Sequence, residues 1–192
     1  QIRQLKDTAM ESSAHEKINL ESACQRLRLA MADLEEIFVN RTEEIAALTL
    51  SIATGQHLLM EGLPGVAKSD LAREAFSRIT GVQVYDKMFN KGTSPDDVFG
   101  PTLIEKYKSG VWEHNTEGAL PTAHFANLEE LGRASDVLLP SMMTVLNERL
   151  FHNGNKVMPC PLITAVATTN FMADTDELAA FNDRWLIRMI VK

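Results

Sequence analysis

The sequence predicts an α/β fold in which a mainly parallel, five-stranded sheet lies between helices. From residue 57 onward, short apolar runs alternate with segments of helical periodicity, the order that builds a parallel sheet covered on both faces. The chain has 192 residues, 45% of them hydrophobic and 23% charged, which is enough for one globular domain with a buried core. Ligands of such sheets bind beyond the carboxyl ends of the strands, so the loops that follow the strands are where a site is expected.

Residues 1–41 are expected to form a helical segment ahead of the core, which takes residues 42–192. Residues 1–18 are polar and of mixed charge, which favours a loosely docked helix. The segment then presents one apolar face, made of Leu27, Met31, Leu34 and Phe38. A second helix is predicted to begin with Thr42 as its N-cap and to stop at Gly55. Its apolar stripe consists of Ile45, Leu48 and Ile52.

Five apolar runs are predicted to be strands, at residues 57–60, 82–89, 124–129, 162–169 and 186–191. Helices are predicted at 69–79 and 139–150. The second of these helices turns inward Leu139, Met142, Met143, Leu146 and Leu150. Asn153-Gly154, just beyond it, is typical of a tight hairpin turn.

The strongest motif follows the first strand, where residues 62–69 read Gly-Leu-Pro-Gly-Val-Ala-Lys-Ser. Glycines let a backbone curl around phosphates, a helix N-terminus adds positive potential, a lysine reaches the terminal phosphates and a hydroxyl binds Mg²⁺. The residues expected to contact ATP are Gly62, Pro64, Gly65, Val66, Ala67, Lys68, Ser69 and Asp70. Ala67 replaces the usual glycine, and we expect it to adopt ordinary helical angles. The alternative is a Gly-Pro turn before an unrelated helix.

This loop resembles that of the MoxR AAA+ ATPases, and most closely their RavA branch. The similarity continues through Ser-Pro-Asp-Asp-Val-Phe-Gly-Pro at 94–101 and Gly-Ala-Leu-Pro at 118–121, and it covers roughly residues 36–190. It implies an AAA+ P-loop core that binds and hydrolyses ATP with Mg²⁺. It also implies a ring oligomer, a hexamer by family analogy, that remodels or activates a partner protein in a chaperone-like manner. A von Willebrand factor A domain protein is the partner that the family suggests.

The resemblance assigns roles to an acidic pair at the end of the third strand. Glu130 corresponds to the residue that activates water, and Glu129, together with Ser69, to the magnesium ligands. Glu129 stands where the family has aspartate, and its extra methylene is expected to displace the magnesium shell. Asn127 is unusual in a strand expected to be buried. A solvated acidic pair is the alternative interpretation.

The remaining catalytic residues are also carried over from the family. Asn170, after the strand at 162–169, corresponds to the sensor that positions water and phosphate, although an isolated asparagine there is usually a turn residue. Arg184 corresponds to the arginine finger inserted into a neighbouring subunit, and Arg188 is a second candidate. A surface salt bridge is the alternative for both. The backbone at 38–41 is a candidate adenine wall, and the helical lid with its second sensor is expected beyond Lys192.

Composition argues against several other classes of protein. The formal net charge of −7 argues against a nucleic-acid-binding surface, so a DNA-remodelling function ranks below an ATP-driven motor and below a nucleotide-binding scaffold with little turnover. No apolar run is long enough to span a bilayer. Cys24 and Cys160 lie in unrelated contexts, which predicts free thiols and a cytoplasmic location. The five histidines show no metal-ligand spacing.

Overall fold

The predicted five-stranded sheet is present in the structure, a computed structural model that describes residues 20–135, 138–170 and 185–192. The strand order is β2-β3-β6-β1-β7, and every neighbouring pair is parallel. The strands are β1 (Leu58–Gly62), β2 (Val84–Met88), β3 (Phe125–Glu129), β6 (Thr164–Thr169) and β7 (Ile187–Val191). Since all five run the same way, their carboxyl ends and the following loops share one edge of the sheet.

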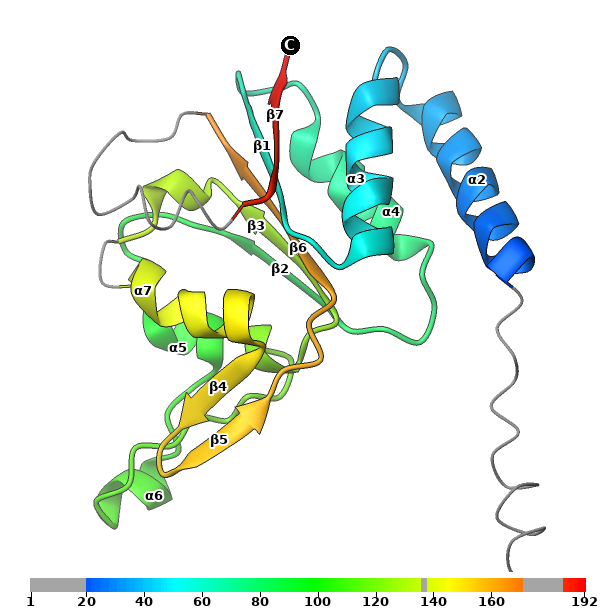
Figure 1. The fold of residues 1–192 in the computed structure, drawn as a ribbon. Coiled ribbons are helices and arrows are strands. Elements are labelled where there is room, and N and C mark those ends of the chain that lie inside the picture. The colour runs from blue at the N-terminus through cyan, green and yellow to red at the C-terminus, as the bar shows by residue number, and fades with distance from the viewer. Residues whose placement is uncertain (1–19, 136–137, 171–184) are drawn as a thin grey trace, which may run out of the picture.

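Helices cover both faces of the sheet (Figure 1). On one face lie α3 (Thr42–Thr54) and α4 (Lys68–Ser77), with α2 (Leu20–Ile37) packed outside them. The other face carries α5 (Pro95–Phe99), α7 (Leu138–Met143) and a π-helical turn, η3 (Thr144–Glu148). The side chains of β3 and β6 are buried along their whole length because both strands lie inside the sheet and are covered on both faces.

The remaining elements project from the sheet or connect its strands. They are α6 (Ile104–Lys108), two 3₁₀ turns, η1 (Leu120–Thr122) and η2 (Leu131–Arg133), and a hairpin of β4 (Leu150–Asn153) and β5 (Lys156–Pro159). The hairpin and α6 lie at the end of the molecule away from the carboxyl edge of the sheet (Figure 1). None of the helices in the described part of the chain combines the length and apolar character needed to cross a membrane.

Two predicted helix boundaries are wrong. The helix expected at 139–150 ends at Met143, continues as the π-helical turn and is stopped by Arg149, whose φ of 55° is left-handed. Leu150, expected on its inner face, instead begins β4. The Arg149 guanidinium donates to the carbonyls of Gly55 and Ile163 at 3.2 Å each, a long-range contact that helical periodicity cannot reveal. At the start of α3, Arg41 rather than Thr42 is the N-cap residue.

The Asn-Gly hairpin is present, but the turn is shifted by one residue. Asn153 is the last residue of β4, paired with Lys156, and the two turn residues are Gly154, with a φ of 61°, and Asn155. The Asn153 side chain explains the shift. Its amide donates to the His114 carbonyl at 3.0 Å and accepts from the His114 N–H at 2.7 Å, as a neighbouring strand would.

Candidate nucleotide site

The loops that follow three neighbouring strands, β3, β6 and β1, converge on one cavity of about 220 Å³. Its lining combines the predicted phosphate loop, the acidic pair and the predicted sensor. The lining residues are Pro64, Gly65, Val66, Ala67, Lys68, Ser69, Asp70, Glu129, Glu130, Thr168 and Asn170. Segments separated by about a hundred residues in the sequence therefore meet at one edge of the sheet.

Gly62 takes no part in this lining. It is the last residue of β1, and a Cβ at this position would clash with the backbone carbonyl of Val191 on β7. Glycine is needed there because two strands pass closely, and a contact between Gly62 and the nucleotide stays a prediction. The Gly62 carbonyl still reaches the site, since it accepts a hydrogen bond from Lys68.

The Lys68 ammonium lies inside the curve of the loop. It donates to the carbonyls of Gly62 at 2.7 Å and Leu63 at 2.8 Å. Burial lowers the pKa of Lys68, while the nearby Glu130 carboxylate opposes the effect by favouring the charged form. The loop thus holds a buried cation at the start of α4, the end of a helix that attracts anions.

The expectation that Ala67 adopts ordinary helical angles is wrong. Its φ is 58° and its ψ is 25°, the left-handed conformation that glycine adopts without strain. A side chain in this region costs about 1–2 kcal/mol. The left-handed turn at Ala67 completes the curl that begins at Gly65, where φ is 83°, so the shape of the loop requires this conformation at the position before Lys68.

Thr168 is a site residue that the sequence analysis did not identify. It lies on β6, and its hydroxyl is 3.1 Å from the Ser69 hydroxyl, which joins the phosphate loop to the strand that leads to Asn170. The threonine-threonine end of a buried strand was a signal that polar groups face this edge. The Asn170 Oδ1 is buried and has no hydrogen-bond partner among the described residues. An unsatisfied amide oxygen in such a cavity favours a ligand or ordered water there.

The acidic pair is split between two environments. Glu129 is buried and forms an ion pair with Arg73 of α4. Glu130 is left-handed, with a φ of 53°, and pairs with Arg133 at 3.1 Å between Oε2 and Nε. The unusual Asn127 is also explained: its Nδ2 lies 3.3 Å from a carboxylate oxygen of Glu129 and 3.3 Å from one of Asp86. The solvated pair considered as an alternative is wrong for Glu129.

Of the two candidate arginine fingers, the structure describes only Arg188. Arg184 lies outside the described residues. Arg188 is on β7 opposite Leu59, near the start of β1, whereas the phosphate loop leaves β1 at its other end. Its guanidinium donates to the Trp185 carbonyl at 3.1 Å.

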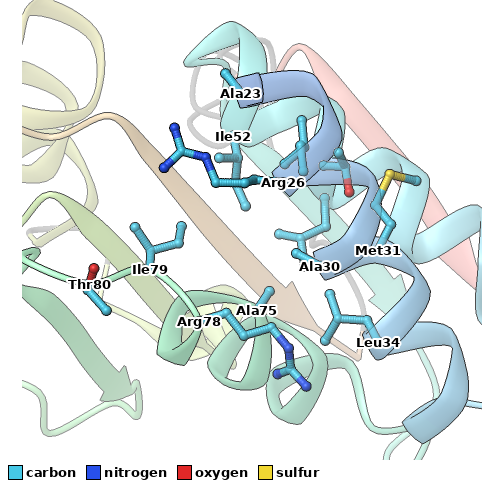
Figure 2. A pocket seen from close by; sticks show the side chains of 13 residues that line it. Ala23, Arg26, Ala30, Met31, Leu34, Ile52, Ala75, Arg78, Ile79 and Thr80 are labelled. Carbon is cyan, nitrogen blue, oxygen red and sulfur yellow. The ribbon is translucent and has the colours of Figure 1, made fainter. Parts of the chain in front are cut away.

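Two further cavities lie outside the phosphate site. One, of about 640 Å³, is lined by Asn40, Arg41, Thr42, Glu43, Glu44, Ile190 and Lys192, and it includes part of the predicted adenine wall. Arg41 closes it by bonding to the carbonyl of Lys192 at 2.7 Å and to Glu44 at 2.9 Å. The other, of about 370 Å³, lies between α2, α3 and the end of α4, with apolar side chains such as Leu34 and Ile79 directed into it (Figure 2). Its lining includes no carboxylate.

The chain is similar to several known proteins. The family profile described as the MoxR domain in the MoxR-vWA-beta-propeller ternary systems matches residues 25–192. An uncharacterized protein of Methanocaldococcus jannaschii is 36% identical over 168 residues, 87% of this chain and 44% of that protein. The chaperone MoxR1 of Mycobacterium tuberculosis is 29% identical over 135 residues, 70% of this chain and 35% of that protein. The chain thus spans less than half the length of these curated relatives.

A solved structure supports the fold alone. The crystal structure of a candidate ATPase from Cytophaga hutchinsonii superposes with a TM-score of 0.64 and 20% identity, over 91% of this chain and 55% of that chain. The α/β core with its parallel five-stranded sheet, predicted from the sequence, is confirmed.

Proposed function

Because the chain belongs to the MoxR family of AAA+ ATPases, we propose that it binds ATP with Mg²⁺ in the cavity of the phosphate loop and hydrolyses it. The observation that carries the proposal is the convergence of Lys68, Glu130 and Asn170 on this one cavity from the ends of three neighbouring strands. A cation, a carboxylate and an amide within one cavity are groups that serve phosphoryl transfer.

Each side chain then has a defined task. Lys68 exchanges its two loop carbonyls for phosphate oxygens, and Glu130 orients the attacking water and accepts its proton. Asn170 bonds to water and phosphate, which supplies the partner that its buried oxygen lacks among the described residues. Ser69 and Glu129 offer a hydroxyl and a carboxylate, oxygen ligands that suit Mg²⁺. Bound Mg²⁺ neutralises charge that develops on the phosphates.

The cavity beside Arg41 is the proposed place of the adenine base. It lies between residue 40 and the end of β7, and its lining combines polar and charged side chains with the apolar Ile190. Val39 and Ile190 are both strongly exposed, which leaves apolar surface for a base to cover.

The family also supports a larger assembly. The matching profile is named for systems that combine MoxR, vWA and β-propeller components, so we propose a vWA-domain protein as a partner and a protein client for the motor. A ring, expected to be a hexamer, would place Arg184 of one subunit at the nucleotide of the next. We also propose that the chain belongs to the RavA branch of the family and that the protein is cytoplasmic.

One observation favours a second candidate function, a nucleotide-binding scaffold with little turnover. The Glu129 carboxylate already has an ion-pair partner, Arg73, and in a scaffold this cation takes the place of the metal. Phosphate release at saturating ATP separates the two functions, because a scaffold binds ATP tightly and releases almost no phosphate.

The experiment for ATP binding is calorimetric titration of the Lys68→Ala protein. Lys68 is bonded to loop carbonyls and supplies charge rather than core packing, so the variant is expected to fold and to lose ATP affinity by at least about tenfold. Lys156→Ala on the exposed hairpin is the matched control, and its affinity should stay unchanged. Wild-type affinity in Lys68→Ala would contradict the proposed site.

A further inference from the structure

Arg73 connects the phosphate loop helix to the acidic end of β3. It lies on α4, one helical turn beyond Ser69, and its guanidinium contacts three carboxylates. Nη1 pairs with Asp70 at 2.8 Å, Nε pairs with Asp86 of β2 at 2.8 Å, and Nη2 pairs with Glu129. The planar fork of an arginine fixes three partners at defined angles, which a lysine cannot do.

The two oxygens of Glu129 are not equivalent. Oε1 receives the Arg73 guanidinium and lies 3.3 Å from the Nδ2 of Asn127. Oε2 receives no hydrogen bond from any described residue, and Glu129 lines the phosphate cavity. One oxygen is therefore held by protein donors, while the other is available to the cavity.

Asp86 holds the guanidinium directly, and Asn127 links Asp86 to Glu129. Asn127 is fully buried in β3, and its Nδ2 also lies 3.3 Å from Oδ1 of Asp86 on the adjacent strand. The hydrogen bond to Asp86, aided by the charges of Asp86, Glu129 and Asp70, raises the pKa of Arg73. Arg73 thus carries its charge at any physiological pH and is oriented by strand residues on both sides.

We propose that Arg73 is a positioning residue for the divalent cation: it holds Oε1 of Glu129 so that Oε2 faces the water shell of the metal. This inference rests on the proposed role of Glu129 at the magnesium site. The extra methylene of glutamate carries the carboxylate far enough to meet Arg73, and Arg73 restricts the rotamers that the longer side chain would otherwise visit. The contact with Arg73 then compensates for the presence of glutamate, instead of the family's aspartate, at position 129.

The sign of the effect separates positioning from simple electrostatics. Removing a positive charge beside a cation site strengthens cation binding if the charge acts only by repulsion or by competing for Glu129. Removing a positioning partner weakens it, because the carboxylate must be ordered when the metal binds. Loss of such a supporting contact costs about 10–100-fold in metal affinity. For Arg73 we expect about tenfold, since the side chain is half exposed and Asn127 still holds Oε1.

The test measures Mn²⁺ affinity by electron paramagnetic resonance, with adenylyl imidodiphosphate bound to the whole natural protein. Arg73→Gln is expected to weaken Mn²⁺ binding about tenfold and to leave metal-free nucleotide affinity unchanged. Arg78→Gln is the matched control. Arg78 closes the same helix and pairs with Glu74 at 2.7 Å, but it lines the cavity beside α2, so its loss should not change Mn²⁺ affinity.

A double-mutant cycle tests whether the effect passes through Glu129. Aspartate at position 129 is too short to keep the Arg73 contact, so Arg73→Gln should change Mn²⁺ affinity less than twofold in a Glu129→Asp background. Tighter or unchanged Mn²⁺ binding in Arg73→Gln alone, or full additivity in the cycle, would overturn the inference. Glu129→Gln distinguishes the underlying proposal: if this variant keeps wild-type Mn²⁺ affinity, the magnesium role of Glu129 itself is wrong.

Discussion

His57 is buried at the end of the sheet opposite the nucleotide site, in a setting that keeps its imidazole neutral. Nδ1 accepts a hydrogen bond from the Ala165 amide at 2.9 Å, and Nε2 donates to the Leu146 carbonyl at 2.6 Å. A second proton would have to bind Nδ1 and face the Ala165 N–H. Burial lowers the pKa of His57 to about 4, the Leu146 bond opposes this shift, and the Arg149 guanidinium adds to it.

The resulting pH dependence can be worked out. The unfolded chain binds a proton at His57 near pH 6.5, whereas the folded chain binds it only near pH 4. The stability that comes from the neutral imidazole is therefore complete above pH 6.5 and is lost as the pH falls toward 4. The whole interval corresponds to about 3 kcal/mol in the free energy of unfolding, of which about 2 kcal/mol is lost between pH 7 and pH 5.

Urea unfolding of the chain at pH 7, 6 and 5 measures this loss. Asp97, whose pKa is lowered to about 2 chiefly by hydrogen bonds from Ser94 and Lys87, titrates below the window and does not interfere. His57→Gln cannot be protonated, so its stability should be nearly constant between pH 7 and pH 5, whatever its absolute value. His152→Gln, on the exposed hairpin, should keep the wild-type dependence. The same slope in His57→Gln as in the wild type would refute the assignment to His57.

Three further outcomes are expected. Ala67→Gly should raise the free energy of unfolding by about 0.5–1 kcal/mol, because relief of the left-handed strain exceeds the added freedom of the unfolded chain. Thermal unfolding measures this change, and a lower melting temperature of the variant would contradict the strain at Ala67. Glu130→Gln should bind ATP normally in calorimetry but release no phosphate, since glutamine cannot accept a proton, and unchanged turnover would move the role of general base to another residue. Arg184→Ala should bind ATP but hydrolyse it about 10³–10⁵-fold more slowly, and mixing it with Lys68→Ala should restore part of the ATPase rate. Rescue that fails at every mixing ratio, in samples shown to co-assemble, would mean that Arg184 does not act on a neighbouring subunit.

Most of the sheet could be predicted from the sequence because the relevant signals are local. A buried parallel strand is a short apolar run, and all five predicted runs contain the observed strands or overlap them. The boundaries differ where a distant partner decides them. Arg149 ends the helical segment because its side chain bonds to Gly55 and Ile163, and the turn after Asn153 is set by the backbone of His114.

The candidate site, like the sheet, was predicted in part from the sequence. The phosphate loop was recognised from its own residue pattern, whereas the acidic pair and Asn170 were identified through the family resemblance. All three segments line the same cavity. Ala67 was found too, but its left-handed angles were not, because they depend on how the loop curls around Lys68 rather than on the residue type. The sequence motif therefore identifies the residues of the phosphate loop, but the folded shape of the loop determines their backbone angles.

The sequence by itself determined the fold class, the three loops that line the cavity and the family. Only the tertiary structure decided what surrounds Glu129, because Arg73, Asp86 and Asn127 belong to three different elements that approach only after α4 packs on the sheet. No local spacing links these residues. Charges and amides buried at such a junction must pair with whatever the packing brings within hydrogen-bond distance, and that is a property of the folded chain.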